Sequence, residues 1–144
     1  MKSRLLVPIL TAMFLAALPS LAHHPFSSEY DWKQPITVKG TVSKLDWTNP
    51  HAHIYVDAKD ADGKTKSWTF ELGGINALTH AGWSKEMVKV GDTVTVDAWL
   101  SKTESNVGNV KSVILPNGRE LSGASSIVDP NANPGDEKTK TDKA

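Results

Sequence analysis

Residues 47–56 read Trp-Thr-Asn-Pro-His-Ala-His-Ile-Tyr-Val, and this stretch decides the fold. An Asn-Pro pair favours a turn and Pro50 cannot donate to a sheet ladder, so we expect one strand to end at Trp47 and another to begin at His51. From there small apolar residues alternate with polar and aromatic ones, which is the period of a half-buried strand. His51 and His53 therefore share the outward face, about 7 Å apart at about 3.3 Å of rise per residue. The stretch predicts a β-protein with two imidazoles on an outer surface.

The flanking sequence supplies more strands and one short helix. The predicted strands are 36–47, 51–59, 65–72, 93–100 and 110–115, and the predicted helix is 75–81. The apolar residues change parity after Val42, close to Gly40, which predicts a bulge or bend in the first strand.

Three strands, a helix and two strands, with a bent first strand, form the layout of the OB-fold. We therefore expect an all-β fold, a five-stranded OB-fold-like barrel with a short helix between strands 3 and 4. A two-sheet sandwich is the alternative, although the chain offers few strands for one.

The two ends of the chain differ in composition from the middle. A basic start, an apolar run over 5–18 and small residues up to Ala22 predict a cleaved secretory signal over residues 1–22. The apolar run is short for a transmembrane helix, so we expect a periplasmic or secreted protein with no stable membrane anchor. The folded domain is predicted over 23–121. The polar segment 122–144 lacks the apolar residues needed to order itself and is predicted to be a disordered tail.

Charge and cysteine content exclude several classes of function. The sequence has 16 basic and 16 acidic residues, and removal of Lys2 and Arg4 with the signal leaves 14 against 16, a net charge near −2. A chain with this balance has no electrostatic basis for binding nucleic acid. The sequence contains no cysteine, which excludes disulfides, zinc–thiolate sites and thiol redox chemistry.

Histidines are the metal-binding residues that the sequence offers. Cleavage after Ala22 would make His23 the N-terminal residue, so that its α-amine and imidazole could chelate one copper ion together with an imidazole from the strand at His51. This arrangement is called a histidine brace. His24 offers a competing mode through its own imidazole, and His53 is a further candidate ligand. We therefore expect a copper protein for storage, delivery or sensing, with His23 and His51 as the ligands and with His24 and His53 as the next candidates.

Two further residues are predicted to support the ligands. Glu71 faces outward on the third strand and could orient an imidazole, and Tyr55 shares the outward face of the second strand. His80 lies near the end of the predicted helix, where an imidazolium interacts favourably with the helix dipole, and is interpreted in that role.

A second hypothesis needs no metal. A His-X-His alternation on a strand is more often a polar solvent face than a pair of metal ligands, so the histidines could be polar contacts for a small ligand or a protein partner. The sequence has no paired nucleophile and base and no phosphate-binding loop, so an enzyme is not expected. A copper-dependent oxidase, which would need an open coordination position and a reductant, is the third hypothesis.

The sequence also resembles a family of small exported bacterial proteins that is catalogued as a domain of unknown function. The matching segments are His23-His24-Pro25-Phe26, 47–52, 71–73 with Asn76, Leu78 and Gly82-Trp83, and 91–96. Members of that family usually read His-His-Ser-Phe after the signal and Trp-Thr-Asn-Pro-His-Ala at the turn. The resemblance spans about residues 23–121; it implies secretion and a small β-fold, and gives no settled activity. It supports His23, His24 and His51, whereas Pro25 replaces the usual serine and His53 stands where members often carry tryptophan.

Overall fold

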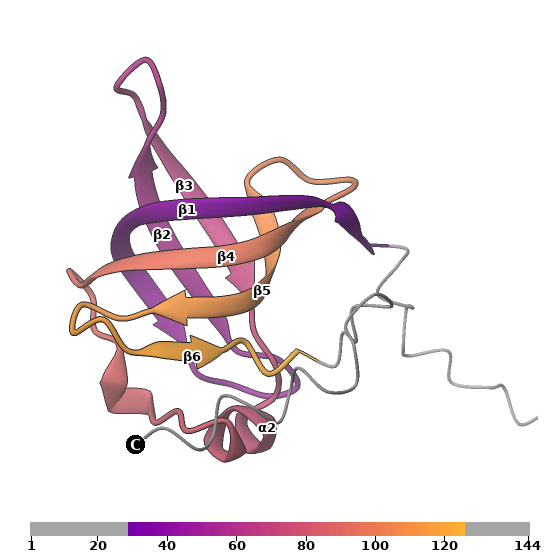
Figure 1. The fold of residues 1–144 in the computed structure, drawn as a ribbon, viewed down its shortest axis with the longest axis vertical. Helices are drawn as coiled ribbons and strands as arrows, with labels where there is room; N and C mark the ends of the chain where they lie inside the picture. Colours follow the sequence, from indigo (N-terminus) through magenta and orange to yellow (C-terminus); the bar gives the residue numbers. More distant parts are fainter. Residues whose placement is uncertain (1–28, 126–144) are drawn as a thin grey trace, which may run out of the picture.

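The computed structural model describes residues 29–125, and strands make up most of this part of the chain (Figure 1). In chain order the elements are β1 (Tyr30–Asp46), β2 (His53–Lys59), β3 (Thr65–Glu71), α2 (Ile75–His80), the 3-10 turn η1 (Lys85–Met87), β4 (Thr93–Ser101), β5 (Val107–Ile114) and β6 (Glu120–Ser122). The prediction of an all-β fold with one short helix between the third and fourth strands is confirmed.

Five of the strands close into a ring. β1 pairs with β2 and β4, β2 pairs with β3, and β4 pairs with β5, all antiparallel. A parallel pairing of β3 with β5 completes the circuit. β6 adds to β5 beyond the ring, so the sheet has six strands where five were predicted. Figure 1 shows α2 beyond one end of the strands.

β1 is the longest strand because it serves two neighbours, β4 along its first part and β2 along its last part, with Thr41 paired to both. Its register against β2 shifts between Val42 and Lys44, which confirms the predicted bulge. Gly40 is needed in this bend, since a Cβ there would overlap the carbonyl oxygen of Asp57 on β2.

The core lies inside the ring and is built from alternate residues of the strands. The predicted inward residues of the second strand are all buried, whereas Trp68 of β3 and Leu100 of β4, which were also predicted to face inward, are only partly buried. The inner residues of these strands include Ala52, Ile54, Val56, Ala58, Phe70, Leu72, Val94, Val96 and Ala98. The alternation in the sequence therefore predicted the inner face correctly.

The starts of β1 and β5 were predicted wrongly. Residues before 36 were expected to be an irregular leader, but β1 begins at Tyr30, which pairs with β4 through a break in register between Asp31 and Pro35. Residues 103–109 were expected to be a loop, but β5 begins at Val107 because its first residues pair with β3 on one side and β4 on the other.

The break in β1 is held by a local turn. The Asp31 carboxylate accepts hydrogen bonds from the Lys33 backbone N–H and the Gln34 side chain, each at 3.0 Å. The backbone hydrogen bond from Lys33 lowers the pKa of Asp31, so the carboxylate is ionised and can accept both hydrogen bonds at neutral pH.

Hydrogen bonds near the C-terminal end of the described region bear on the predicted boundary between the domain and its tail. Ser122 accepts a 2.7 Å hydrogen bond from the Trp83 indole, and the Gly123 carbonyl accepts one at 2.8 Å from Gly73. The hydrogen-bonded chain thus continues past the predicted boundary at residue 122. The predicted signal peptide over 1–22 and the tail from residue 126 lie outside the described residues.

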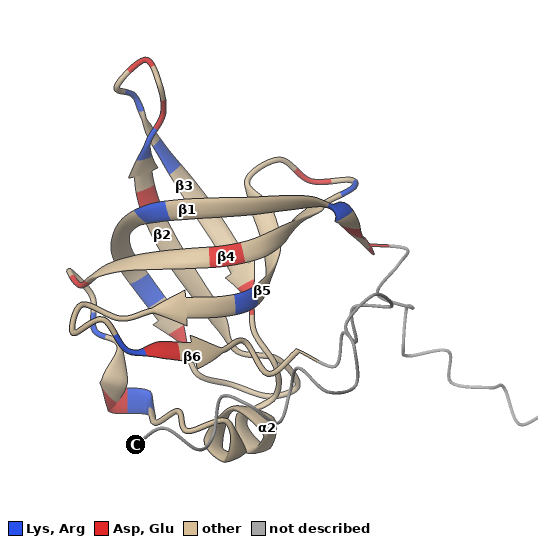
Figure 2. Ribbon diagram, viewed as in Figure 1, with Lys and Arg blue, Asp and Glu red and all other residues tan. Residues whose placement is uncertain are grey.

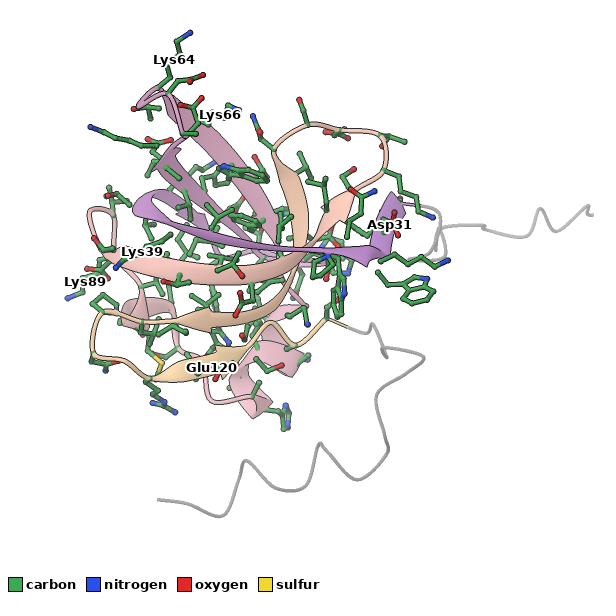
Figure 3. All side chains as sticks on the ribbon, turned by 45° about the horizontal axis from the view of Figure 1, so that its top comes forward. Asp31, Lys39, Lys64, Lys66, Lys89 and Glu120 are labelled. Carbon is green, nitrogen blue, oxygen red and sulfur yellow. The ribbon has the colours of Figure 1, made fainter. Side chains whose placement is uncertain are left out.

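Charged residues are interspersed along the ribbon rather than gathered by sign (Figure 2). Lys64 and Lys66 project at the tip of the β2–β3 hairpin, and Asp31 lies at the start of β1, away from that tip (Figure 3). Within residues 29–125, none of the helices has the length and apolar character needed to cross a membrane.

Candidate functional site

Glu71, the last residue of β3, holds two polar groups from distant parts of the chain. Its Oε1 lies 2.9 Å from Nδ1 of His51, and its Oε2 accepts a 2.8 Å hydrogen bond from the hydroxyl of Tyr30. The Glu71 side chain is 19% exposed and that of His51 is 49% exposed. Three segments, the start of β1, the turn before β2 and the end of β3, therefore meet at one carboxylate.

The turn before β2 places His51 beside Glu71. Ala52 exchanges backbone hydrogen bonds with the two residues that follow β3, donating to Gly73 at 3.1 Å and accepting from Leu72 at 2.8 Å. The side chain of Asn49 accepts a 3.1 Å hydrogen bond from the first backbone N–H of α2, which ties the turn to the helix. His51 thus lies just outside β2, whereas it was predicted to lie within the strand. Hydrogen bonds of Asn49 and Ala52 hold the turn on both sides of it.

Tyr30 is buried, with 6% of its surface exposed. Burial raises the pKa of its phenol well above the ordinary value of 10.0, and the hydrogen bond and the charge of Glu71 raise it further. The phenol therefore stays protonated and acts as a hydrogen-bond donor to Glu71. The residue before β1 is also bonded to the residue after β4, because the Lys102 N–H donates to the Glu29 carbonyl at 2.9 Å.

The raised pKa of Tyr30 predicts a loss of stability in alkali. The unfolded chain releases the phenolic proton near pH 10 while the folded chain keeps it, so this contribution is complete below about pH 10 and falls as the pH rises further, by up to about 1.4 kcal/mol per pH unit. Tyr30→Phe should remove this component. Urea unfolding at pH 8, 10 and 11 should show the stability advantage of the unmodified protein over Tyr30→Phe shrinking above pH 10. An advantage that is the same at all three pH values would contradict the assignment.

A hollow of about 370 Å³ adjoins Glu71 and Tyr30. Among residues 29–125, its lining includes Glu29, Glu71 and Glu104 together with His53 and Tyr30, and it includes no lysine or arginine. His53 stands directly opposite Glu71 in the β2–β3 register. The lining is acidic, so the hollow is suited to a ligand that carries positive charge.

The structure brings together some of the predicted site residues. His51, His53 and Glu71 gather at the end of β3, and Glu71 contacts an imidazole as predicted. Tyr55 does not join them through any hydrogen bond described; its ring lies 4.9 Å from the Nζ of Lys44. His80 donates from Nδ1 to the carbonyl of Asn76 at 2.7 Å, within its own helix.

His23 and His24, the two N-terminal ligand candidates, lie outside the described residues. Within residues 29–125, no group of three or more histidine, aspartate and glutamate side chains is arranged to hold a metal ion.

Two residues of the site were missed by sequence reasoning. Tyr30 was visible only as one aromatic in a short polar segment, because its partner Glu71 is 41 residues away. Asn109 was placed in a loop; it pairs with Glu71 across the β3–β5 seam, is 2% exposed, and its Oδ1 has no hydrogen-bond partner among the described residues. No periodic pattern signals either residue.

Comparison with known proteins gives one match. The model of a family described as a family of unknown function (DUF6152) matches residues 12–110. No curated protein and no solved structure matches the chain.

Proposed function

Because the chain belongs to the DUF6152 family, whose function is unknown, we propose its function from the residues around Glu71: the protein binds a metal ion, copper, for storage, delivery or sensing. The proposed ligands are His51 and the processed N-terminal His23, with His24 and His53 as further candidates. The proposal includes export to the periplasm or beyond the cell, with cleavage after Ala22.

The observation that carries this proposal is the contact of His51 Nδ1 with Glu71 at 2.9 Å. A histidine that binds a metal through one ring nitrogen almost always donates its other N–H to a carboxylate, a carbonyl or water, which orients the ring and raises its basicity. The pair has this form, and it leaves Nε2 of His51 as the nitrogen for a metal.

The position of β1 supports the use of an N-terminal ligand. Tyr30 donates to the same carboxylate that contacts His51, so the described chain begins at the site itself. His23 precedes Tyr30 by seven positions, and a chain of that length spans at most about 25 Å. His23 and His24 are therefore within reach of His51.

We also assign the ring to the OB-fold. The support is the circuit β1-β2-β3-β5-β4 with the helix between β3 and β4. OB-folds bind ligands on the face of strands 2 and 3 and at the loops that follow strands 1 and 4. His51 lies in the first of these loops, Glu71 ends strand 3, and Glu104 of the hollow lies in the second loop.

The proposal predicts copper binding that depends on a free N-terminal histidine. Processed protein that begins at His23 should bind Cu(II) one to one by calorimetric titration, with nitrogen ligands in its spin resonance spectrum. One glycine added before His23 should weaken binding at least tenfold, because the amine is no longer beside the first imidazole. His51→Ala should weaken it as well.

His80→Ala is the matched control, since His80 bonds within its own helix, and it should bind as the unmodified protein does. Binding that is indifferent to the added glycine would overturn the N-terminal chelate. Absence of Cu(II) binding would overturn the metal function altogether.

The hollow favours a second candidate function, the binding of a small, positively charged ligand without a metal. This candidate gains if the processed protein fails to bind Cu(II). A copper-dependent oxidase follows only if copper binds and retains an open coordination position; oxygen consumption by the copper-loaded protein with ascorbate would then test it.

A further inference from the structure

We propose that Tyr30 is a positioning residue of this site: through Glu71 it fixes His51 in the tautomer that carries hydrogen on Nδ1, and so leaves Nε2 as the binding nitrogen. The effect of this tautomer on metal binding rests on the proposed function. The tautomer itself can be measured without metal.

The two oxygens of Glu71 are each engaged by a different donor. Oε2 accepts from the Tyr30 hydroxyl at 2.8 Å, and Oε1 lies 2.9 Å from His51 Nδ1. Contacts at both oxygens restrain the rotation of the carboxylate about its last bond. An ionised carboxylate only accepts hydrogen bonds, so the hydrogen shared with His51 has to sit on Nδ1.

Tyr30 is suited to hold Glu71 because it is fixed itself. It is the first residue of β1, pairs with Ser101 of β4, and is 6% exposed. A buried phenol that keeps its proton is a constant hydrogen-bond donor to one oxygen of the carboxylate. Tyr30 therefore acts on His51 through Glu71 and has no direct role in holding the metal.

The sequence supplies a matched control, because it contains two tyrosines, Tyr30 and Tyr55. Tyr55 lies on β2, the strand that His51 precedes, and its ring lies near Lys44. Parity along that strand pointed to Tyr55 as the supporting residue. The structure points to Tyr30, so comparison of Tyr30→Phe with Tyr55→Phe separates the two.

The test uses processed, ¹⁵N-labelled protein without metal at about pH 8, where an ordinary imidazole is neutral. Long-range proton–nitrogen spectra should show hydrogen on Nδ1 of His51 in the unmodified protein and in Tyr55→Phe. In Tyr30→Phe we expect a mixture with the Nε2 tautomer. Calorimetric titration with Cu(II) should then give about tenfold weaker binding for Tyr30→Phe and unchanged binding for Tyr55→Phe.

A His51 tautomer that is the same in Tyr30→Phe as in the unmodified protein would overturn the inference, even if copper binds. The expected tautomer shift without any copper binding would instead leave the positioning role intact and overturn the metal function. Thermal unfolding checks that both variants are folded.

If Tyr30→Phe does not fold, 3-fluorotyrosine incorporated into Tyr55→Phe labels Tyr30 alone and keeps its hydrogen bond. Its more acidic hydroxyl should then shift the Nδ1 resonance of His51, and the absence of a shift would contradict the role of Tyr30.

Discussion

Replacement of Phe70 by alanine is expected to lower the free energy of unfolding by about 3–5 kcal/mol. Phe70 has no exposed surface and is among the largest side chains that are fully buried. It lies in β3, opposite Ile54 of β2 and Gly108 of β5, with its ring stacked 5.6 Å from that of Trp68. Its removal leaves a cavity at the point where the ring closes, which the surrounding strands cannot fill without losing their pairing.

Urea unfolding followed by tryptophan fluorescence measures this change. Trp32→Ala is the control, because Trp32 is an aromatic residue that is 38% exposed, and its contact with Lys33 contributes about 1 kcal/mol or less. If the two substitutions destabilise the protein equally, Phe70 is not the centre of the core.

Gly40→Ala is expected to cost about 2–3 kcal/mol, which is large for the addition of one methyl group. The new Cβ would overlap the backbone carbonyl of Asp57 and lie 2.7 Å from a methyl carbon of Val56. The carbonyl cannot move aside freely, because Asp57 pairs with Thr41 in the β1–β2 ladder. β1 would have to straighten, and it would then lose its pairing with either β2 or β4.

Lys39→Ala is the matched control for this substitution. Lys39 is the preceding residue of the same strand and is exposed, so its truncation should change the free energy of unfolding by no more than about 0.5 kcal/mol. Thermal and urea unfolding of both variants decide the question. A Gly40→Ala protein as stable as Lys39→Ala would mean that the bend accommodates a side chain.

The elements that depend on local signals could be predicted from the sequence. Alternation determined the inner face of β2, the parity change after Val42 located the bulge, and Gly82 marked the end of α2, where it adopts a φ of +89°. The starts of β1 and β5 could not be predicted, because both depend on strands that are distant in sequence. Tyr30 pairs with Ser101, and Val107 pairs with Thr69.

The candidate site also contains residues that local patterns could predict and residues that they could not. Glu71 was predicted as a partner of a histidine because the outward parities of two adjacent strands place them together, and His51 does contact it. The tyrosine was assigned to Tyr55, which shares a strand face with His53. Parity along one strand cannot identify a residue that arrives from across the ring, as Tyr30 does.

The seam between β3 and β5 couples this site to the integrity of the fold. Only three residue pairs join the two strands, and one of them is Glu71 with Asn109. A local opening that separated these strands would also disturb the surroundings of Glu71, without requiring the rest of the domain to unfold. A ligand held beside Glu71 would therefore favour the closed seam, by an amount set by its concentration relative to its dissociation constant. Occupancy would then appear as slower exchange of the amide hydrogens along β3 and β5.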